Sequence, residues 1–394
     1  MIKLLIIHNY YQDSGGEDLV FKQECELLAT TCQVEKLEYK NHKGFRGFGQ
    51  FLLYPCNFAA VKRLDRVLQS FNPDVVHIHN LHYAAGPMLI RRLEKLNIPV
   101  VMTIHNYRLL CPSATLFHNG KLFTNSLREA FPWTAIRKGV WSNSSIKTAW
   151  LAWTNHWHQR RGTWNKVNRY FLLTGFAKNL FSDSDLQLPS EKLIVKPNFI
   201  KPIVYNNKEE RQAHFLFVGR LSEEKGLRTL VKVFSQNQLP LRIVGTGPLS
   251  DELLKTCNEY TNITLLGSLS ASEVQQEMRR SQALIFPSEW YEGMPMTILE
   301  AFSTKTPVIA SRLGAMESMI TDGENGLLFT AGEPGALQQC LDRWKHLSEH
   351  EKDEIGGRGY HSFLTHYSPE SNLNLLLDQY KQVIRENSNG KKSN

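Results

Sequence analysis

The sequence predicts an α/β protein of two domains, each built on a doubly wound parallel sheet. Short runs rich in leucine and β-branched residues alternate with longer segments of helical periodicity, as expected for successive strand–helix–strand units. The chain has 394 residues, of which 42% are hydrophobic, so it is long enough to form two cores of ordinary size. A polar segment near the middle separates two sets of strand-like runs, which places the expected boundary near residue 200.

Nine segments have the composition of buried strands. Four lie in the first half, at residues 4–7, 75–78, 100–104 and 170–174, and five lie in the second half, at 214–218, 241–244, 263–266, 283–286 and 307–310. Between the two sets, Pro197 follows a short apolar run and a polar stretch occupies 206–211, which is typical of a linker. We therefore expect an N-terminal domain at 1–198 and a second domain at 199–365.

The C-terminal segment, 366–394, predicts one helix followed by a tail. Ser368 and Pro369 are typical of a helix start, and helical spacing brings five apolar residues to one face: Leu373, Leu376, Leu377, Tyr380 and Ile384. We expect this face to pack back toward the N-terminal domain. The polar residues from Asn387 to Asn394 are expected to be disordered.

Charge and cysteine content narrow the class of protein. The formal net charge of +8 favours an anionic partner, which can be a phosphorylated ligand, a nucleic acid or an anionic membrane surface. The six cysteines are scattered without a CxxC pair, which predicts reduced thiols in the cytoplasm. No apolar run reaches the roughly 20 residues that a membrane-spanning helix needs. Any membrane contact is therefore expected to be peripheral.

The second domain opens with a strand that ends in a glycine and two separated cations. The segment 219–226 reads Gly-Arg-Leu-Ser-Glu-Glu-Lys-Gly, so Arg220 and Lys225 follow the carboxyl end of the strand. Ligands of open α/β sheets bind at that end, and both side chains suit phosphate oxygens. The alternative interpretation is a helix start with solvated charges, and this segment alone does not decide between the two.

A second motif, at 287–302, combines a helix start with two carboxylates. Glu292 lies in the loop before Gly293, Met294, Pro295 and Met296, and Glu300 lies inside the helix that follows. Amide groups at a helix start suit anionic or hydroxyl-rich ligands, and carboxylates suit sugar hydroxyls. Glu292 can also be an ordinary loop charge. Glu300 stands among apolar residues, where an unused carboxylate is costly.

The loop after the first strand carries the paired glycines Gly15 and Gly16, which allow a ligand to approach the backbone closely. It is not a GxGxxG sequence, which disfavours a dinucleotide-dependent dehydrogenase. A plain flexible loop is the alternative interpretation.

Taken together, these segments resemble the retaining glycosyltransferases of family 4, of the type found in bacterial surface-polysaccharide synthesis. Glu292 and Glu300 match the family's Glu-x7-Glu motif, and 219–226 resembles its diphosphate-binding segment. Further similarities are Pro197-Asn198, the segments 245–248, 266–268 and 322–329, and Glu317. In the first half, 74–80 and 103–108 are similar to family segments that end two parallel strands. Lys305 departs from the family, which commonly has glycine there.

The resemblance implies a fold and a set of roles. The expected fold is GT-B: two Rossmann-like doubly wound parallel-sheet domains facing across a cleft, with the acceptor on the first and the nucleotide sugar on the second. Catalysis would use His105, Glu292, Arg220 and Lys225, with His105 near the reacting carbon, Glu292 on sugar hydroxyls and Glu300 on the ribose. The donor-binding set implied is Gly15, Gly16, Gly219, Arg220, Lys225, Gly245, Gly267, Glu292, Gly293, Met294, Pro295, Met296 and Glu300. No metal and no cofactor are implied.

Two other patterns suggest metal chemistry. Asp183-Ser184-Asp185 spells the DxD of metal-dependent transferases, but it lies outside a strand end, and a solvated loop is the better interpretation. His77, His79 and His82 form HxHxxH, which with His105 could serve a metal-dependent hydrolase. Leu81 stands where such enzymes usually carry aspartate.

The segment from Trp133 to Lys178 contains six tryptophans and several cations but no acidic residue. This composition suits a helix in the interface of an anionic membrane, and it equally suits tryptophans packed in the core of the first domain. No nucleic-acid-binding signature accompanies it, so no nucleic-acid partner is expected.

From the sequence we therefore expect a cytoplasmic glycosyltransferase, peripheral on the inner face of the membrane. It would move a sugar, with retention, from a nucleoside diphosphate sugar to a hydroxyl of a surface glycan or a lipid-linked intermediate. The alternatives are the metal-dependent hydrolase and a GT-B protein that binds glycans or nucleotides without turnover. The donor, the acceptor and the oligomeric state are not encoded in these motifs.

Overall fold

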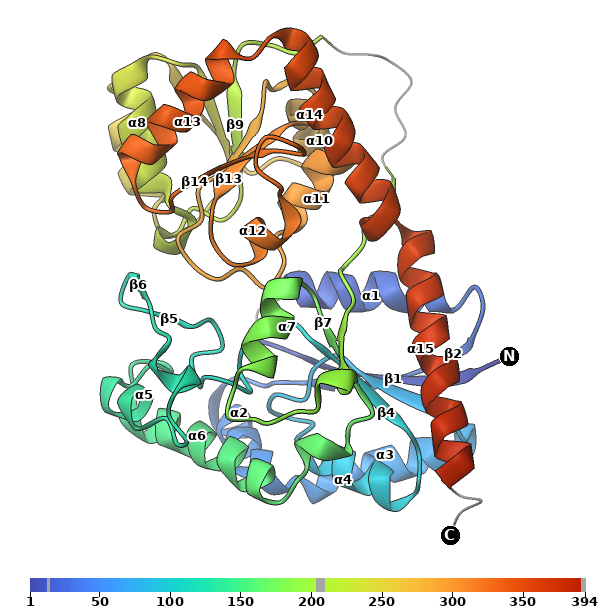
Figure 1. The fold of residues 1–394 in the computed structure, drawn as a ribbon. Helices are drawn as coiled ribbons and strands as arrows, with labels where there is room; N and C mark the ends of the chain where they lie inside the picture. Colours follow the sequence, from blue (N-terminus) through green and yellow to red (C-terminus); the bar gives the residue numbers. More distant parts are fainter. Residues whose placement is uncertain (13–14, 203–209, 391–394) are drawn as a thin grey trace. The chain divides into compact units, whose positions relative to one another are not determined.

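The structure, a computed structural model, describes residues 1–12, 15–202 and 210–390. The chain forms two compact units (Figure 1). The first unit comprises Met1–Thr115, Thr124–Pro197 and Asn372–Asn394, and the second comprises Leu116–Phe123 and Asn198–Ser371. Residues 116–123, which the sequence places in the first domain, thus group with the second unit. Most of the expected linker, 206–209, lies outside the described residues.

The first unit is built on a parallel sheet of six strands in the order β2-β1-β3-β4-β7-β8. Hydrophobic side chains fill the central strands because both faces of a parallel sheet are covered by helices. β2 is an edge strand that exposes most of its charged residues. The strands are β1 (Lys3–Tyr10), β2 (Gln33–Lys40), β3 (Val75–Ile78), β4 (Val100–Ile104), β7 (Arg169–Leu172) and β8 (Leu193–Val195).

Helices cover both faces of this sheet (Figure 1). The core on one face is formed by β1, α1 and the C-terminal helix α15 (Pro369–Gly390), with Leu4, Phe21 and Tyr380 fully buried. α3 and α4 lie on the other face (Figure 1). The helices that precede α15 in this unit are α1 (Gly16–Leu28), α2 (Gly44–Leu53), α3 (Phe58–Phe71), α4 (Met88–Lys95), α5 (Trp133–Lys138), α6 (Ser145–Arg160) and α7 (Gly175–Ser182).

The second unit has a parallel sheet in the order β11-β10-β9-β12-β13-β14, which is the strand order of a Rossmann fold. A short hairpin of β5 (Phe117–His118) and β6 (Lys121–Leu122) belongs to the same unit. The strands of the sheet are β9 (Phe215–Val218), β10 (Leu241–Val244), β11 (Ile263–Gly267), β12 (Leu284–Phe286), β13 (Val308–Ser311) and β14 (Leu327–Phe329).

α8 and α13 pack on one face of the second sheet, while α10 and α11 lie on the other (Figure 1). The core on the first face is centred on Phe217, Phe234 and Trp344. Lys305 adopts the left-handed conformation, with φ of 58°, where the related proteins commonly have glycine. The helices are α8 (Leu227–Asn237), α9 (Ser250–Cys257), α10 (Ala271–Arg280), α11 (Met296–Ser303), α12 (Ala315–Met319), α13 (Pro334–His346) and α14 (Glu349–Ser362).

The C-terminal helix is longer than the sequence suggests. The Ser368 hydroxyl accepts a hydrogen bond from the amide of Ser371 at 3.2 Å, as expected for a helix cap. Leu376, Tyr380 and Val383 are buried against the first sheet, which accounts for the apolar face. The helix continues to Gly390, so the expectation that disorder begins at Asn387 is wrong: the Asn387 amide donates to the carbonyl of Asn97 at 2.8 Å.

A buried ion pair joins α1 to the residue after β8. The carboxylate of Glu24 pairs with the ammonium of Lys196, and both side chains are fully buried. The other carboxylate oxygen lies 3.3 Å from His77 and 3.1 Å from His79. Burial alone would raise the pKa of Glu24, but Lys196 and the two imidazoles hold it well below its usual range. The first sheet, its first helix and its last strand thus share one charged centre.

Removing this carboxylate should destabilise the first unit strongly. In Glu24→Gln the Lys196 ammonium stays buried without a counter-charge, which costs about 3–5 kcal/mol. The measurement is urea unfolding followed by tryptophan fluorescence, since the tryptophans between Trp133 and Trp164 all lie in this unit.

The matched control is Glu94→Gln, which removes a pair with Lys166 whose side chains are each 42% exposed. This variant should lose at most about 1 kcal/mol. Equal unfolding midpoints for the two variants would contradict a structural role for the buried pair.

Candidate functional site

The strand order of the second sheet creates a crevice between two loops. The chain runs outward from β9 through β10 to β11 on one side, and from β12 through β13 to β14 on the other. The loops after β9 and β12 therefore leave neighbouring strands in opposite directions, and ligands of such sheets bind at this point. These two loops are the segments 219–226 and 287–295, which carry the two sequence motifs.

Lys225 and Glu292 meet in this crevice. The ammonium of Lys225 donates a hydrogen bond of 2.7 Å to Oε1 of Glu292, and the Ser288 hydroxyl donates to the same oxygen at 2.7 Å. The Lys225 nitrogen also lies 5.3 Å from the ring centre of Trp290. Glu292 is buried, so the pair is partly shielded from water and its interaction is stronger than that of a surface pair.

Backbone contacts hold the two loops together. The amide of Glu289 donates to the carbonyl of Glu224 at 2.8 Å, next to Lys225. Gly226 has a φ of 70°, and a Cβ at that position would lie 2.0 Å from the carbonyl oxygen of Pro287. Only glycine allows this approach. The sequence Lys225-Gly226 thus couples a charged side chain to the backbone contact that positions it.

Three predicted glycines gather at the carboxyl ends of β9, β10 and β11. The amide of Gly219 donates to Val244 at 3.0 Å, and the amide of Gly245 donates to Gly267 at 2.8 Å. Gly245 has a φ of 138°, and a Cβ there would lie 1.8 Å from the carbonyl oxygen of Gly219. The glycines therefore let adjacent loops pack closely, in agreement with a site where backbone approaches a ligand.

Arg220 is placed differently from Lys225. It is exposed in the loop after β9, and in the part of the chain that the structure describes its side chain forms no ion pair with Glu292 or another carboxylate. The loop itself is fixed, because the amide of Leu221 donates to Thr246 at 3.0 Å. The structure thus brings Lys225 and Glu292 together and leaves Arg220 at the surface of the same loop.

The segment before α11 is tied to the start of the second unit. The amide of Asn198 donates to the sulfur of Met294 at 3.1 Å, and its side chain lies 3.6 Å from the sulfur of Met296. Pro295 is the residue before the helix, so the predicted helix start at this proline holds within one residue. Asn198 therefore fixes the loop that carries Gly293 and Glu292.

Glu300 lies half-buried in α11. From the sequence this carboxylate was expected among apolar residues, where burying it without a function is costly. Burial raises the pKa of its carboxyl group from 4.5 to about 7. At neutral pH this group therefore exchanges a proton readily and can act as hydrogen-bond donor or acceptor.

In the first unit, His105 directly follows β4 and bonds to a second histidine. Its Nε2 lies 3.1 Å from Nδ1 of His79, and the rings stack with centres 5.3 Å apart. His79 in turn lies 3.1 Å from Glu24. Burial and the neighbouring His79 lower the pKa of His105 well below 6.5, so its imidazole is neutral at pH 7.

Gly15 and Gly16 form the start of α1. Gly15 is the residue before the helix, and its amide donates to Asp18 at 3.0 Å. A Cβ on either glycine would meet no described atom within 4 Å, so the backbone is accessible at this helix start. Asp18 also bonds to Nε2 of His8 at 2.8 Å. Sequence reasoning did not single out His8 or Asp18.

The four histidines suggested for a metal site are not equivalent. His77 and His79 lie with Glu24 in a group whose ligand atoms are all within 4.8 Å of one another. Lys196 already compensates the charge of that carboxylate. His82 instead bonds to the hydroxyl of Tyr54. The HxHxxH spacing therefore does not bring its three imidazoles to one centre.

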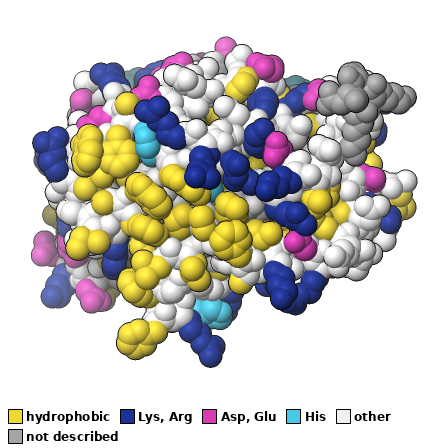
Figure 2. All heavy atoms as spheres, turned by 90° about the horizontal axis from the view of Figure 1, so that it is seen from below, with side chains coloured by type: hydrophobic (Ala, Val, Ile, Leu, Met, Phe, Trp, Pro, Cys, Tyr) yellow, Lys and Arg dark blue, Asp and Glu magenta, His cyan; other side chains and the backbone are white. Residues whose placement is uncertain are grey.

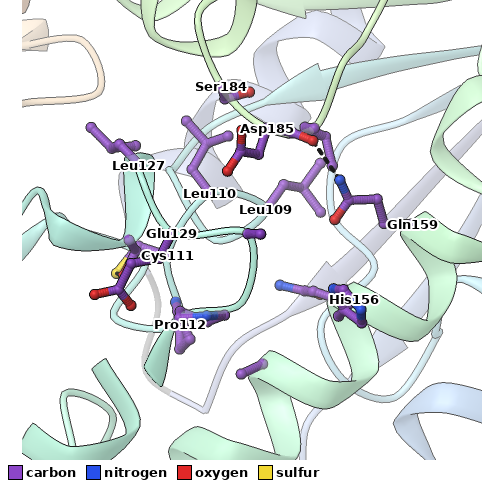
Figure 3. Close-up of a pocket in the computed structure, with 16 residues that line it drawn as sticks. Leu109, Leu110, Cys111, Pro112, Leu127, Glu129, His156, Gln159, Ser184 and Asp185 are labelled. Atoms are coloured by element: carbon purple, nitrogen blue, oxygen red, sulfur yellow. Dashed lines mark hydrogen bonds between the residues drawn. The ribbon is translucent and has the colours of Figure 1, made fainter. Parts of the chain in front are cut away.

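The Asp183–Asp185 segment follows α7, as a loop. Both aspartates are exposed, and the side-chain amide of Gln159 donates to the carbonyl of Asp185 at 2.6 Å (Figure 3). Ser184 and Asp185 line a cavity of about 50 Å³ together with Leu109 and Cys111 (Figure 3). Ligand sites usually hold about 300–1,000 Å³. The DxD segment thus has the geometry of a capped helix end and not of a diphosphate site.

Comparison with known proteins agrees with this architecture. The model of glycosyl transferases group 1 matches residues 202–359, and the model of glycosyltransferase family 4 matches residues 24–202. An uncharacterised glycosyltransferase of Methanocaldococcus jannaschii is 26% identical over 86% of this chain and 88% of its own length. A putative teichuronic acid biosynthesis glycosyltransferase of Bacillus subtilis is 26% identical over 79% of this chain and 72% of its own.

Solved structures share the fold along the whole chain. A glycosyltransferase from Rickettsia africae has a TM-score of 0.70 at 16% identity and covers 97% of this chain and 99% of its own. The Anabaena protein HepE, solved with UDP and glucose, has a TM-score of 0.61 at 15% identity and covers 97% of this chain and 100% of its own.

The two sheets and the matching models define a glycosyltransferase of the GT-B fold. The chain belongs to glycosyltransferase family 4.

Ionisation of Glu300 should reduce stability as pH rises. Its native pKa of about 7 exceeds the unfolded value near 4.5, so the native state holds the proton more tightly and stability is lost between these two pH values. We expect the parent chain to lose about 1–3 kcal/mol relative to Glu300→Gln between pH 5 and pH 8. Thermal unfolding of both chains across this range measures the difference. Glu259→Gln, which removes an exposed carboxylate of the same unit, controls for charge. A gap between parent and Glu300→Gln that does not change with pH would contradict the burial of this group.

Proposed function

We propose that this glycosyltransferase moves a sugar from a nucleoside diphosphate sugar to a hydroxyl of a surface glycan or a lipid-linked intermediate, with retention. The observation that carries the proposal is the Lys225–Glu292 pair in the crevice between β9 and β12. Relatives support the substrate classes: one is named for teichuronic acid biosynthesis, another is an O-antigen chain mannosyltransferase, and a solved neighbour holds UDP and glucose.

In this proposal the charges act on the leaving group. As the bond between the anomeric carbon and the diphosphate oxygen breaks, negative charge grows on the phosphate, and Lys225 and Arg220 offset it. The acceptor oxygen bonds to the anomeric carbon, and its proton passes to the departing phosphate oxygen. Glu292 binds sugar hydroxyls and, through its bond to Lys225, keeps the ammonium oriented. Glu300 binds the ribose.

His105 is assigned to the donor sugar near the reacting carbon. Its imidazole is neutral at pH 7, so it can form a hydrogen bond without adding a second positive charge beside a carbon that becomes cationic. The backbone at Gly15 and Gly16, at the start of α1, is assigned to the donor phosphates as at other helix starts, with a phosphate displacing Asp18 from the Gly15 amide.

Two cations in place of a divalent ion imply that the reaction needs no metal and no cofactor. Transfer should therefore continue in the presence of EDTA. Loss of activity with EDTA, and its return with Mg²⁺ or Mn²⁺, would overturn this part of the proposal.

The experiment that tests the function is a screen of nucleotide sugars. The best donor is identified by thermal stabilisation and incubated with the parent chain, and the released nucleoside diphosphate is measured. The same assay is run on Lys225→Ala and Arg220→Ala. The control is Lys232→Ala, which changes an exposed lysine on α8. Loss of a charge aimed at the leaving group should lower kcat about 10²–10³-fold for Lys225→Ala. Lys232→Ala should match the parent. NMR of the product anomer reports retention. Equal rates for Lys225→Ala and the control would refute the site.

We further propose contact with an anionic membrane surface through the segment from Trp133 to Lys178. Trp133 and Trp153 are 62% and 44% exposed, whereas Trp164 is buried in the core. Figure 2 shows hydrophobic side chains gathered beside a group of lysines and arginines on the side where α5 and α6 lie. Of the helices that the structure describes, none is long and apolar enough to cross a bilayer. These features support peripheral binding to an anionic membrane surface.

Membrane binding should depend on these two indoles and on lipid charge. The double variant Trp133→Ser, Trp153→Ser should co-sediment with phosphatidylglycerol vesicles several-fold less than the parent, because interfacial indoles contribute to binding at headgroup depth. Phosphatidylcholine vesicles should bind the parent weakly. Leu254→Ser, which removes an exposed apolar side chain of the second unit, is the control. Co-sedimentation that is unchanged by the double variant would rule out this surface.

A further inference from the structure

A second cavity lies in the first unit, beside α2 and the start of α6. It encloses about 620 Å³, within the range of small-molecule sites. Its lining combines the aromatic rings of Tyr11, Tyr83 and Trp141 with two cations, Arg108 and Lys147. No single sequence motif pointed to this cavity, because its walls come from five separate parts of the chain.

Arg108 is the buried charge of the cavity. It is 4% exposed, and its guanidinium lies 4.4 Å from the ring centre of Trp141 and donates to the Tyr83 hydroxyl at 2.8 Å. Its Nε has no hydrogen-bond partner among the described residues. The guanidinium is thus held mainly by aromatic rings and phenols, and its charge also acts on the carboxyl group of Glu17, which is outside the cavity lining. The neighbouring phenols raise the pKa of Arg108 against burial, so it is fully charged.

The lining is positive overall. Lys147, in the first turn of α6, adds a second ammonium, and of the cavity-lining residues that the structure describes none carries a carboxylate. Two cations in the lining of one cavity suit a phosphate group, because guanidinium nitrogens can donate to two of its oxygens at once.

Part of the lining is apolar and continues onto the protein surface. Phe48 and Phe51 of α2 line the cavity, and Phe45 and Leu52 of the same helix are exposed. α2 has no buried residue and no acidic residue in its first turn. The indole nitrogen of Trp150 donates to the carbonyl of Phe51 at 2.9 Å, so α2 and the tryptophan-rich helix α6 form one surface. That surface is the side seen in Figure 2, where hydrophobic and basic side chains lie together.

We infer that this cavity binds the phosphate of a lipid-linked acceptor, with Arg108 and Lys147 on the phosphate and the chain of the lipid along Phe48 and α2. The inference rests on the proposed function, whose acceptor class it narrows to a phosphate-bearing amphiphile. A soluble glycan does not account for the exposed phenylalanines, and a free nucleotide does not account for an apolar wall that opens at the surface. A phosphate joined to a hydrocarbon chain accounts for both the cations and the apolar residues of the lining.

The test measures binding of decyl phosphate below its micelle concentration to the full chain without nucleotide sugar, by quenching of tryptophan fluorescence. Inorganic phosphate and the uncharged decyl glucoside are the two comparison probes. Decyl phosphate should bind at least about tenfold more tightly than either, because only it engages both the cations and the apolar wall.

Lys147→Gln and Phe48→Ser, both at exposed positions, should each weaken the binding of decyl phosphate about three- to tenfold. Arg108→Gln should weaken it more. Arg137→Gln, an exposed cation outside the cavity, should bind as the parent does.

Three results would overturn the inference. Equal binding of decyl glucoside would show that only the hydrocarbon chain is recognised, and equal binding of inorganic phosphate would show a simple anion site. The inference would also be overturned if Lys147→Gln and Phe48→Ser bind decyl phosphate as tightly as Arg137→Gln does. Failure of the proposed function is read separately, from nucleotide-sugar stabilisation and its dependence on Lys225. A chain that binds decyl phosphate as expected but transfers no sugar would retain the cavity assignment and lose the transfer reaction.

Discussion

The buried pair of Glu24 and Lys196 is the constraint on which the first unit depends. It places two opposite charges in the core, at the junction of the first helix and the last strand of the sheet. The same carboxylate contacts His79, which bonds to His105. The neutral imidazole of His105, at the end of β4, is therefore held by His79, and His79 in turn is held by the charged Glu24. Because the members of such a network act together, the position of His105 depends on residues far from it in sequence.

In the second unit, strand topology positions the site residues, as the buried charges do in the first unit. The reversal of strand order between β9 and β12 opens a crevice into which both adjoining loops project. Lys225 and Glu292 come from these loops and satisfy each other until a ligand competes for them. Arg220 leaves the same strand but remains exposed. Of the two cations in this short motif, Lys225 is therefore already held by a carboxylate, whereas Arg220 is not.

Much of the fold could be predicted because parallel sheets leave a strong pattern in sequence. The strands at 75–78, 100–104 and 241–244 have the predicted bounds, since they are central and almost wholly apolar. β2 was missed because it is mostly polar and its alternation is broken: Val34 and Leu37 are three residues apart, a spacing that a helix also gives. β14 is only three residues long, too short to be distinguished by composition. The motif residues were found by their spacing, but the bond of Ser288 to Glu292 and the surroundings of Arg108 arise from tertiary contacts that no local pattern records. The roles assigned to the site residues remain predictions.

The lack of a side chain at Gly226 helps to set the distance between the charges of Lys225 and Glu292. A methyl group there would have to displace the Pro287 carbonyl, and with it the peptide leading to Glu292. The ammonium next to it would then face a carboxylate that had moved away. The spacing of two opposite charges in this enzyme is thus controlled by one hydrogen atom, at a position that carries no charge.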